Sequence, residues 1–315
     1  MNPIDSGRRF LGQVRQRAEQ AVDRTQEAVG NAVNTVRDTA VQGARQVDSF
    51  VDGVEDRVTR GARAANEFFG GGNQPDRVHD GQFVGASGRT FPPGTPLSAI
   101  PGVLPRDNPR PTETLIYVNG IRTDLAGQSN SLQAIADRTG ARVVGIHNST
   151  TGSGADVIQT ITDKLDVGRN PPVDTLADTV YSELRAGRSV HLMAHSHGGI
   201  ITSRALNDVA RRLRIEDGMS RADVERTMAR VNVETFGAAA MNYPDGPNYV
   251  HYVNRDDFVP TAVGLGNGTG VDEHLRNPGR GAVVHRFDQQ NDAHGMDTTY
   301  LSRRVPFEQA REGRF

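Results

Sequence analysis

Along residues 112–315, apolar blocks with the length of strands alternate with stretches in which apolar residues recur at helical spacing. The apolar blocks predict six strands, at 114–118, 142–146, 189–193, 231–236, 250–253 and 282–287. The helical spacing predicts helices over 128–138, 154–166, 173–186 and 197–213. Because strands and helices alternate, we expect an α/β domain with a mostly parallel sheet and helices on both faces. Such sheets bind ligands at the carboxyl ends of their strands.

A different pattern runs through residues 1–69, where small apolar residues follow each other in steps of 4, 4 and 3. This spacing is close to an eleven-residue repeat and predicts one long amphipathic helix. Its apolar stripe consists mostly of valine and alanine, and each interior glycine costs roughly 1 kcal/mol relative to alanine. We therefore expect a marginal helix that needs support, by self-association, from a protein partner or from a membrane surface.

Residues 70–111 follow neither pattern. They open on Gly70-Gly71-Gly72 and contain eight prolines, which disfavour helices and central strands. This composition predicts a linker, parts of which can lie along the next domain through the apolar residues Phe83, Phe91, Ile100 and Leu104. The expected chain therefore consists of an amphipathic helical region (1–69), a Gly/Pro-rich linker (70–111) and an α/β domain (112–315), in which residues 214–229 are candidates for a small cap.

Composition narrows the chemistry that the chain can perform. A formal net charge of -2 gives no electrostatic reason to expect nucleic-acid binding. The absence of cysteine excludes disulfides, thiolate metal sites and a cysteine nucleophile. The sequence contains neither an H-E-x-x-H zinc motif nor the Lys-Ser or Lys-Thr pair of a phosphate-binding loop. We therefore expect no metal and no cofactor.

The distribution of apolar residues also bears on location. No apolar run approaches the roughly 18 residues of a membrane-spanning helix. The N-terminus lacks the apolar core of a cleaved signal peptide. We expect a chain without transmembrane helices that is cytoplasmic, or that is exported without a cleaved signal peptide.

Candidate chemistry concentrates after the third predicted strand, in Ala194-His195-Ser196-His197-Gly198-Gly199. A predicted helix begins at once, so Ser196 occupies a sharp turn between strand and helix. Such a turn exposes the hydroxyl and aims N–H groups of the helix start at a developing oxyanion, as a serine nucleophile requires. The alternative is a helix N-cap, in which the Ser196 hydroxyl only accepts bonds from backbone N–H groups.

This segment resembles the nucleophile elbow G-x-S-x-G of the α/β-hydrolase superfamily, with Ala194 in place of the first glycine. The resemblance covers roughly residues 112–300, is closest to lipases and esterases, and implies the chain order serine, acid, histidine. Asp257-Phe258-Val259-Pro260 resembles the D-x-V-P segment that carries the acid in lipases. Asp257 is therefore the expected acid and Asp256 its rival, while an Asx turn at a strand end is the alternative role.

The same resemblance implies a catalytic histidine in a polar loop after the last strand, where His294 lies. His285 is a rival, but it falls inside an apolar strand, where we expect a structural imidazole. His195 and His197 flank the serine and are expected to line the pocket or pack beneath it. The remaining histidines at strands are expected to be structural: His147, His191 and His251.

An oxyanion hole needs a second N–H donor besides that of His197, and the resemblance assigns it to the loop after the first strand. That strand ends in Asn119-Gly120, which makes the N–H of Ile121 the expected donor. An ordinary Asn-Gly turn is the alternative. The small polar residues 145–154 follow the next strand and are expected to form a wall of the same pocket.

The function implied by the resemblance is hydrolysis of a carboxylic ester, in a small-molecule or lipid substrate, through Ser196, His294, Asp257 and an acyl-enzyme. Two alternatives stay open: an acyltransferase using the same residues, and a non-catalytic interaction protein with a degenerate hydrolase domain. A helix, a linker and a lipase-like domain also fit a bacterial effector, by analogy of architecture alone.

Overall fold

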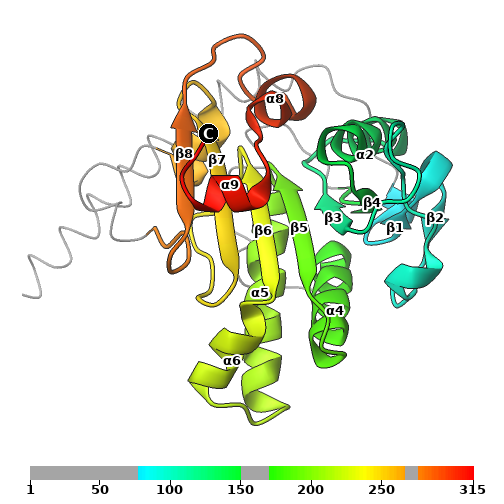
Figure 1. Ribbon diagram of the computed structural model, residues 1–315, viewed down its shortest axis with the longest axis vertical. Coiled ribbons are helices and arrows are strands. Elements are labelled where there is room, and N and C mark those ends of the chain that lie inside the picture. Colours follow the sequence, from blue (N-terminus) through cyan, green and yellow to red (C-terminus); the bar gives the residue numbers. More distant parts are fainter. Residues whose placement is uncertain (1–76, 150–169, 267–275) are drawn as a thin grey trace, which may run out of the picture. The chain divides into compact units, whose positions relative to one another are not determined.

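The computed structural model describes residues 77–149, 170–266 and 276–315, and these residues form an α/β fold around one sheet (Figure 1). The strands are β1 (Phe83–Val84), β2 (Thr90–Phe91), β3 (Thr114–Val118), β4 (Arg142–Ile146), β5 (Val190–His195), β6 (Val231–Phe236), β7 (Asn248–Asn254) and β8 (Val283–Phe287). The α-helices are α2 (Leu125–Thr139), α4 (Pro171–Arg185), α5 (Gly198–Ile215), α6 (Arg221–Met228), α7 (Phe258–Val263), α8 (Leu301–Arg303) and α9 (Phe307–Arg311). Short turns complete the order: 3-10 turns η1 (Arg77–His79), η2 (Ala86–Gly88) and η3 (Leu97–Ala99), and a π-helical turn η5 (Met296–Tyr300).

The strand order explains where a ligand site can form. The eight strands lie in the order β2-β1-β4-β3-β5-β6-β7-β8, parallel from β4 to β8, with β1 antiparallel to both of its neighbours. From β3 the chain passes to β4 on one side and then returns to β5 on the other. The carboxyl ends of β3 and β5 therefore flank a topological switch point, the position at which open α/β sheets bind ligands.

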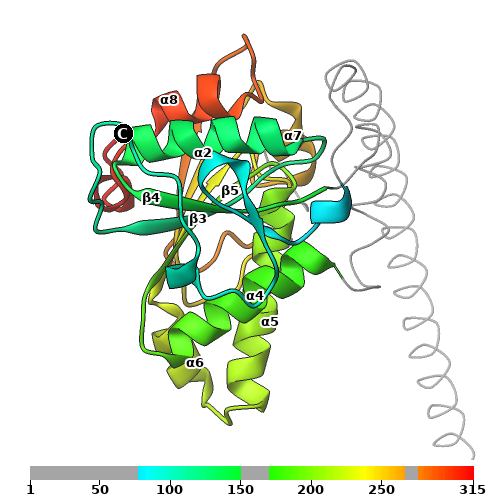
Figure 2. The ribbon, with the colours of Figure 1, turned by 90° about the vertical axis from the view of Figure 1, so that its right-hand side faces the viewer.

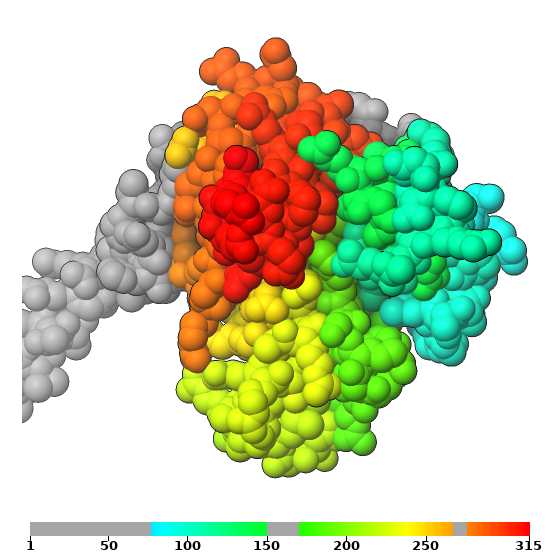
Figure 3. Space-filling view, in the orientation of Figure 1, coloured from blue at the N-terminus to red at the C-terminus, as the bar shows by residue number. Residues whose placement is uncertain are grey.

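Each face of the sheet buries its own apolar cluster because side chains alternate along a strand. On β3, Ile116 and Val118 pack with α4 and α5, while Leu115 and Tyr117 pack with α2 and the C-terminal elements. Figure 2 shows α2 on one side of the sheet and α4 and α5 on the other. The C-terminal residues, red in Figure 3, gather at the front of the molecule over the sheet face that they share with α2.

Local sequence accounts for the ends of the helices. The Asp124 carboxylate caps α2 by accepting from the Gly127 N–H at 2.6 Å, and Gly140 ends the same helix with a φ of 70°. The Asn170 side chain caps α4 by accepting from the Val173 N–H at 3.2 Å, ahead of Pro171. All six predicted strands and the predicted helices over 128–138, 173–186 and 197–213 are confirmed. The predicted helices over 1–69 and 154–166 lie outside the described residues.

The structure differs from the prediction of a linker at 77–111. Phe83 and Ile100 are fully buried there, and β1 pairs with β4 and β2 at the sheet edge, with Phe83 opposite Ile146. Strands of two residues are too short to show an alternating pattern, and prolines are tolerated beside an edge strand. Composition alone therefore predicts a linker, although residues 77–111 contribute to the core.

The expectation of a cap over residues 214–229 is also wrong. These residues contain α6, which packs against α5 and ends three residues before β6 begins. Because β6 starts there, α6 lies at the amino ends of the strands, at the edge away from the carboxyl end of β5 (Figure 1).

No helix of the described ranges combines the length and the apolar character needed to cross a bilayer.

Candidate active site

Ser196 forms the turn that connects β5 to α5. Its φ of 56° lies in the left-handed region, which is strained for a residue with a side chain and typical of functional turns. The turn is fixed by neighbouring backbone: the Ser196 N–H donates to the Phe236 carbonyl at 3.1 Å, and the Ser196 carbonyl accepts from the N–H of Gly199 and of Ala239, both at 3.0 Å. The strained conformation is thus held by hydrogen bonds with the end of β6, with the loop that follows it and with the first turn of α5.

The glycines after Ser196 are needed for close packing. A Cβ at Gly198 would lie 2.3 Å from the Val118 carbonyl oxygen, and a Cβ at Gly199 would lie 2.5 Å from the Cβ of Ala238. Helix α5 can therefore approach the carboxyl ends of β3 and β6 only because both positions lack side chains. This close approach brings Ser196 to the topological switch point.

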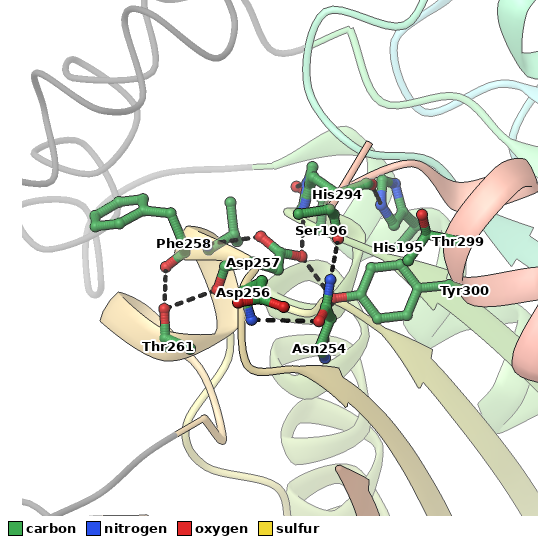
Figure 4. Close-up of polar contacts among 12 residues, drawn as sticks. His195, Ser196, Asn254, Asp256, Asp257, Phe258, Thr261, His294, Thr299 and Tyr300 are labelled. Atoms are coloured by element: carbon green, nitrogen blue, oxygen red, sulfur yellow. Dashed lines mark hydrogen bonds and ion pairs between the residues drawn. The ribbon is translucent and has the colours of Figure 1, made fainter. Parts of the chain in front are cut away.

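The hydroxyl of Ser196 faces a histidine and not the start of its own helix. His197 is the N-cap of α5, and its side chain makes no capping bond. The Ser196 Oγ lies 2.8 Å from Nε2 of His294 (Figure 4). The N-cap alternative therefore does not describe the contact that this serine makes.

His294 links Ser196 to a buried carboxylate. Its Nδ1 lies 2.6 Å from Oδ2 of Asp257, and the three residues are at most 6% exposed. Since a carboxylate only accepts hydrogen bonds, Nδ1 carries the proton and Nε2 is left to accept the Ser196 O–H. The structure thus brings together Ser196, His294 and Asp257, which lie far apart in the sequence.

Asp257 holds its position through its second oxygen. Oδ1 accepts from the Val259 N–H at 2.9 Å and so caps α7, while Oδ2 faces His294. The turn-capping role and the histidine contact, alternatives in the sequence, coexist on one carboxylate. The rival Asp256 is exposed, and its backbone N–H donates to the Asn254 side chain at 3.2 Å.

The predicted oxyanion loop lies against the serine. A Cβ at Gly120 would lie 3.0 Å from the Ser196 Cβ, so this loop position also depends on glycine. Ile121 is the next residue and is 9% exposed, and His197 begins the helix on the other side of Ser196. The geometry of the two N–H groups toward a bound oxyanion stays a prediction.

Two buried asparagines hold this loop. The Asn119 amide donates to the carbonyl oxygens of Gly120 and Asn148, at 2.8 and 2.9 Å, and its oxygen accepts from the Asn148 N–H at 2.9 Å. The Asn148 amide donates in return to the carbonyls of Asn119 and Gly120, both at 3.3 Å. Asn148 lies in the polar segment expected as a pocket wall, of which residues 150–154 are outside the described ranges.

The histidines beside Ser196 are neutral and contact different partners. His195 Nε2 lies 2.9 Å from the His294 carbonyl, to which it donates, and burial holds its pKa well below the usual value. His197 Nδ1 accepts from the Asn148 amide at 3.1 Å, and burial with the nearby charge of Arg204 lowers its pKa to about 4. His195 thus supports the His294 backbone, while His197 joins the asparagine pair.

The other histidines named in the sequence analysis contact residues outside the Ser196–His294–Asp257 series. His285 stacks on Phe315 with a ring separation of 3.8 Å. His147 contacts the Gln128 side chain at 2.7 Å, and His251 contacts the Thr235 hydroxyl at 2.8 Å. His191 contacts two glutamates, described below.

Sequence reasoning missed two residues of the site. The Tyr300 hydroxyl donates to Oδ2 of Asp257 at 2.5 Å. The Asn254 amide donates to the carbonyls of Gln289 and Ala293, at 2.7 and 2.9 Å, and so ties the loop of His294 to the end of β7. A buried strand that ends in asparagine is a weak signal for such a role, and Tyr300 has no local signal.

Comparisons with known proteins do not assign the chain to a family. No family model matches the sequence, and no curated protein is significantly similar to it. Within the described residues, no group of three or more histidine, aspartate or glutamate side chains is arranged to hold a metal ion.

Proposed function

We propose that the chain is a serine hydrolase of the α/β-hydrolase superfamily that cleaves carboxylic esters. The observation that carries the proposal is the hydrogen-bonded series Ser196–His294–Asp257 at the topological switch point of a mostly parallel sheet. Those are the contacts that a Ser-His-Asp triad requires, in the chain order of that superfamily. The strained φ of Ser196 agrees with a nucleophile elbow.

In the proposed reaction, the Ser196 Oγ attacks the ester carbonyl while His294 Nε2 takes its proton. Asp257 keeps the imidazole in the correct tautomer and stabilises the imidazolium. The N–H groups of Ile121 and His197 stabilise the oxyanion. The oxyanion collapses, the alcohol leaves with the proton from His294, and an acyl-enzyme remains. Water, deprotonated by His294, then releases the acid and restores Ser196.

A fluorophosphonate probe tests this proposal directly, because it phosphonylates only activated serines. We expect labelling of the wild-type chain, mapped to Ser196 by mass spectrometry, and no labelling of Ser196→Ala. Ser203→Ala is the matched control, since Ser203 lies one to two turns along α5 and donates to the Asn242 carbonyl. A folded wild-type chain that stays unlabelled would favour the degenerate interaction protein and refute the hydrolase.

Product analysis separates hydrolysis from acyl transfer. A series of p-nitrophenyl esters of increasing acyl length should release nitrophenol in a burst followed by steady turnover, and the series defines the preferred acyl chain. If added alcohols capture the acyl group in preference to water, the chain is an acyltransferase with the same residues. The roles proposed for residues 1–69, in self-association, partner binding or membrane contact, stay predictions, as do cytoplasmic location and export without a signal peptide.

A further inference from the structure

Tyr300 makes a short hydrogen bond to the carboxylate of the candidate triad. Its hydroxyl lies 2.5 Å from Asp257 Oδ2, the same oxygen that His294 Nδ1 contacts at 2.6 Å. Figure 4 shows the Tyr300 ring reaching Asp257 from the C-terminal helical turn. The carboxylate therefore accepts three hydrogen bonds, two of them on the oxygen that faces the histidine.

The direction of the Tyr300 proton is fixed by its other partner. The Asn254 backbone N–H points to the Tyr300 oxygen at 3.3 Å and can only donate, so the hydroxyl accepts there and donates to Asp257. Tyr300 is fully buried, and burial together with the negative charge of Asp257 raises its pKa. The phenol therefore stays protonated, as a donor must.

The fold makes room for this contact at Gly237. A Cβ there would lie 2.7 Å from Asp257 Oδ2 and 2.8 Å from the Tyr300 oxygen, and the φ of 51° also favours glycine. Tyr300 itself ends the π-helical turn η5, a type of turn that is rare and frequent at functional sites. The positive φ of Gly237 and the π-helical turn η5, two departures from regular backbone geometry, thus both lie at the Tyr300–Asp257 hydrogen bond.

We propose that Tyr300 is a positioning residue of the Ser196–His294–Asp257 triad, whose hydroxyl orients the Asp257 carboxylate and limits its basicity toward His294. The inference rests on the proposed hydrolase function. Without the hydroxyl, Oδ2 loses one of two donors and its charge is less dispersed. The imidazolium of His294 then becomes more stable relative to the neutral imidazole, so a higher pH is needed to generate the base. The carboxylate also becomes free to turn away from its reactive orientation.

Other titratable groups surround the pair, and the test leaves them unchanged. They are His195, whose ring centroid lies 4.6 Å from that of His294 and 6.1 Å from that of Tyr300, and three residues that are close in the chain to Asp257 or His294: Asp256, Asp292 and Asp297. His195 is neutral because burial lowers its pKa, and burial raises the pKa of Asp297. A shift caused by Tyr300 alone is therefore measurable against a constant background.

The experiment measures the rate of Ser196 labelling by a fluorophosphonate between about pH 5 and 9, where an imidazole titrates. Tyr300→Phe keeps the ring and removes the hydroxyl. We expect its maximal rate to fall on the order of tenfold, as for the loss of one hydrogen bond to a charged group, and its pH midpoint to rise. The matched control is Tyr249→Phe, which removes another buried hydroxyl, 2.8 Å from the Pro244 carbonyl, and should change neither quantity.

A second variant tests the sign of the effect. Site-specific 3-fluorotyrosine at position 300 is a stronger donor, and we expect it to restore the rate and to move the pH midpoint below that of the wild type. If Tyr300→Phe does not fold, judged by its thermal transition, the fluorotyrosine variant decides alone.

The outcomes separate the two claims. A labelled wild type whose rate and midpoint are unchanged by phenylalanine or fluorotyrosine at position 300 overturns the role of Tyr300 and leaves the hydrolase intact. A folded wild type without labelling at Ser196 overturns both.

Discussion

Two buried histidines contact carboxylates at opposite ends of the strands, which we call the two edges of the sheet. They differ in the group that Nε2 contacts. At the carboxyl ends of the strands, His294 contacts Asp257 through Nδ1 and the Ser196 hydroxyl through Nε2. At the other edge, His191 contacts Glu113 through Nδ1 at 2.5 Å and Glu234 through Nε2 at 3.0 Å. An imidazole between two carboxylates must donate twice, so it is held as a cation with no nitrogen left to accept a proton.

The surroundings of His191 strengthen this difference. Burial lowers its pKa, but hydrogen bonds to Glu113 and Glu234 outweigh burial and leave that pKa raised. Burial likewise raises the pKa of Glu234, yet its bonds to His191 and Arg304 leave it lowered. Arg304 donates to both oxygens of Glu234, at 2.9 and 3.0 Å. His191, Glu234 and Arg304 therefore form a buried ion cluster, whereas His294, the proposed base, has one nitrogen that accepts a hydrogen bond.

The largest expected effect distinguishes the two histidines. His294→Gln should reduce the rate of Ser196 labelling on the order of 10⁴-fold, because the serine would lose its proposed base and Asp257 its partner. His191→Gln should leave that rate within a few-fold when it is normalised to the folded fraction measured by circular dichroism. Equal losses in folded preparations of both variants would contradict the distinction between base and structural cation.

The free energy of unfolding, in contrast, should depend most on the ion cluster of His191. Glu234→Gln leaves Arg304 and His191 without their buried countercharge, and breaking such a pair costs about 3–5 kcal/mol. Urea denaturation measures this loss, with Glu183→Gln as the control, since its Arg188 partner is 57% exposed. A loss below about 1 kcal/mol, typical of surface pairs, would show that the cluster is not a buried ionic support.

A smaller effect tests the asparagine pair beside Ser196. Asn148→Ala leaves buried groups of Asn119 unsatisfied, which costs about 1–3 kcal/mol, and loosens the loop that holds Gly120 against Ser196. We expect slower labelling at an unchanged pH midpoint, because both asparagines are neutral. Asn248→Ala is the matched control at the other edge, where its amide donates to Asn232. Equal labelling rates in the two variants would show that the asparagine pair does not organise the site.

The smallest effect concerns the half-exposed Glu113. A hydrogen bond to His191 lowers the Glu113 pKa, so its contribution is present above the unfolded value of about 4.3 and is lost as pH falls through the folded value. Because the pKa of His191 is raised, His191 contributes fully to the free energy of unfolding below about pH 6.5. This contribution is lost as pH rises through the pKa of His191 in the folded chain. Glu113→Gln should thus cost most between about pH 5 and 6.5, by under about 1 kcal/mol. Urea denaturation across this range checks the window, and a cost that keeps rising above it would contradict the sign.

The sequence was most informative where the signal was local or followed the strand order. The six strands and the sharp turn at Ser196 follow from apolar runs and small residues, whereas Asp257 and His294 were expected from the resemblance to the α/β-hydrolase superfamily. The ion cluster of His191 could not be predicted from the sequence, because Glu234 and Arg304 lie 43 and more than 100 residues away from His191 in the chain. Tyr300 was missed for the same reason, since only the folded chain brings it to Asp257. The strands at 83–91 were missed because two-residue strands carry no periodic pattern.

The last described elements connect the two edges of the sheet. Tyr300 contacts Asp257 at one edge, and Arg304, four residues later, contacts Glu234 at the other. Arg138 on α2 donates to the carbonyls of Ser302 and Arg304 between them. During synthesis on the ribosome, a chain that has emerged only through β7 would carry the proposed nucleophile without His294 and without this brace. If Ser196 acts as proposed, such a nascent chain would be inert toward esters, and the sheet face that α2 covers would lack the rest of its covering until residues 294–311 had followed.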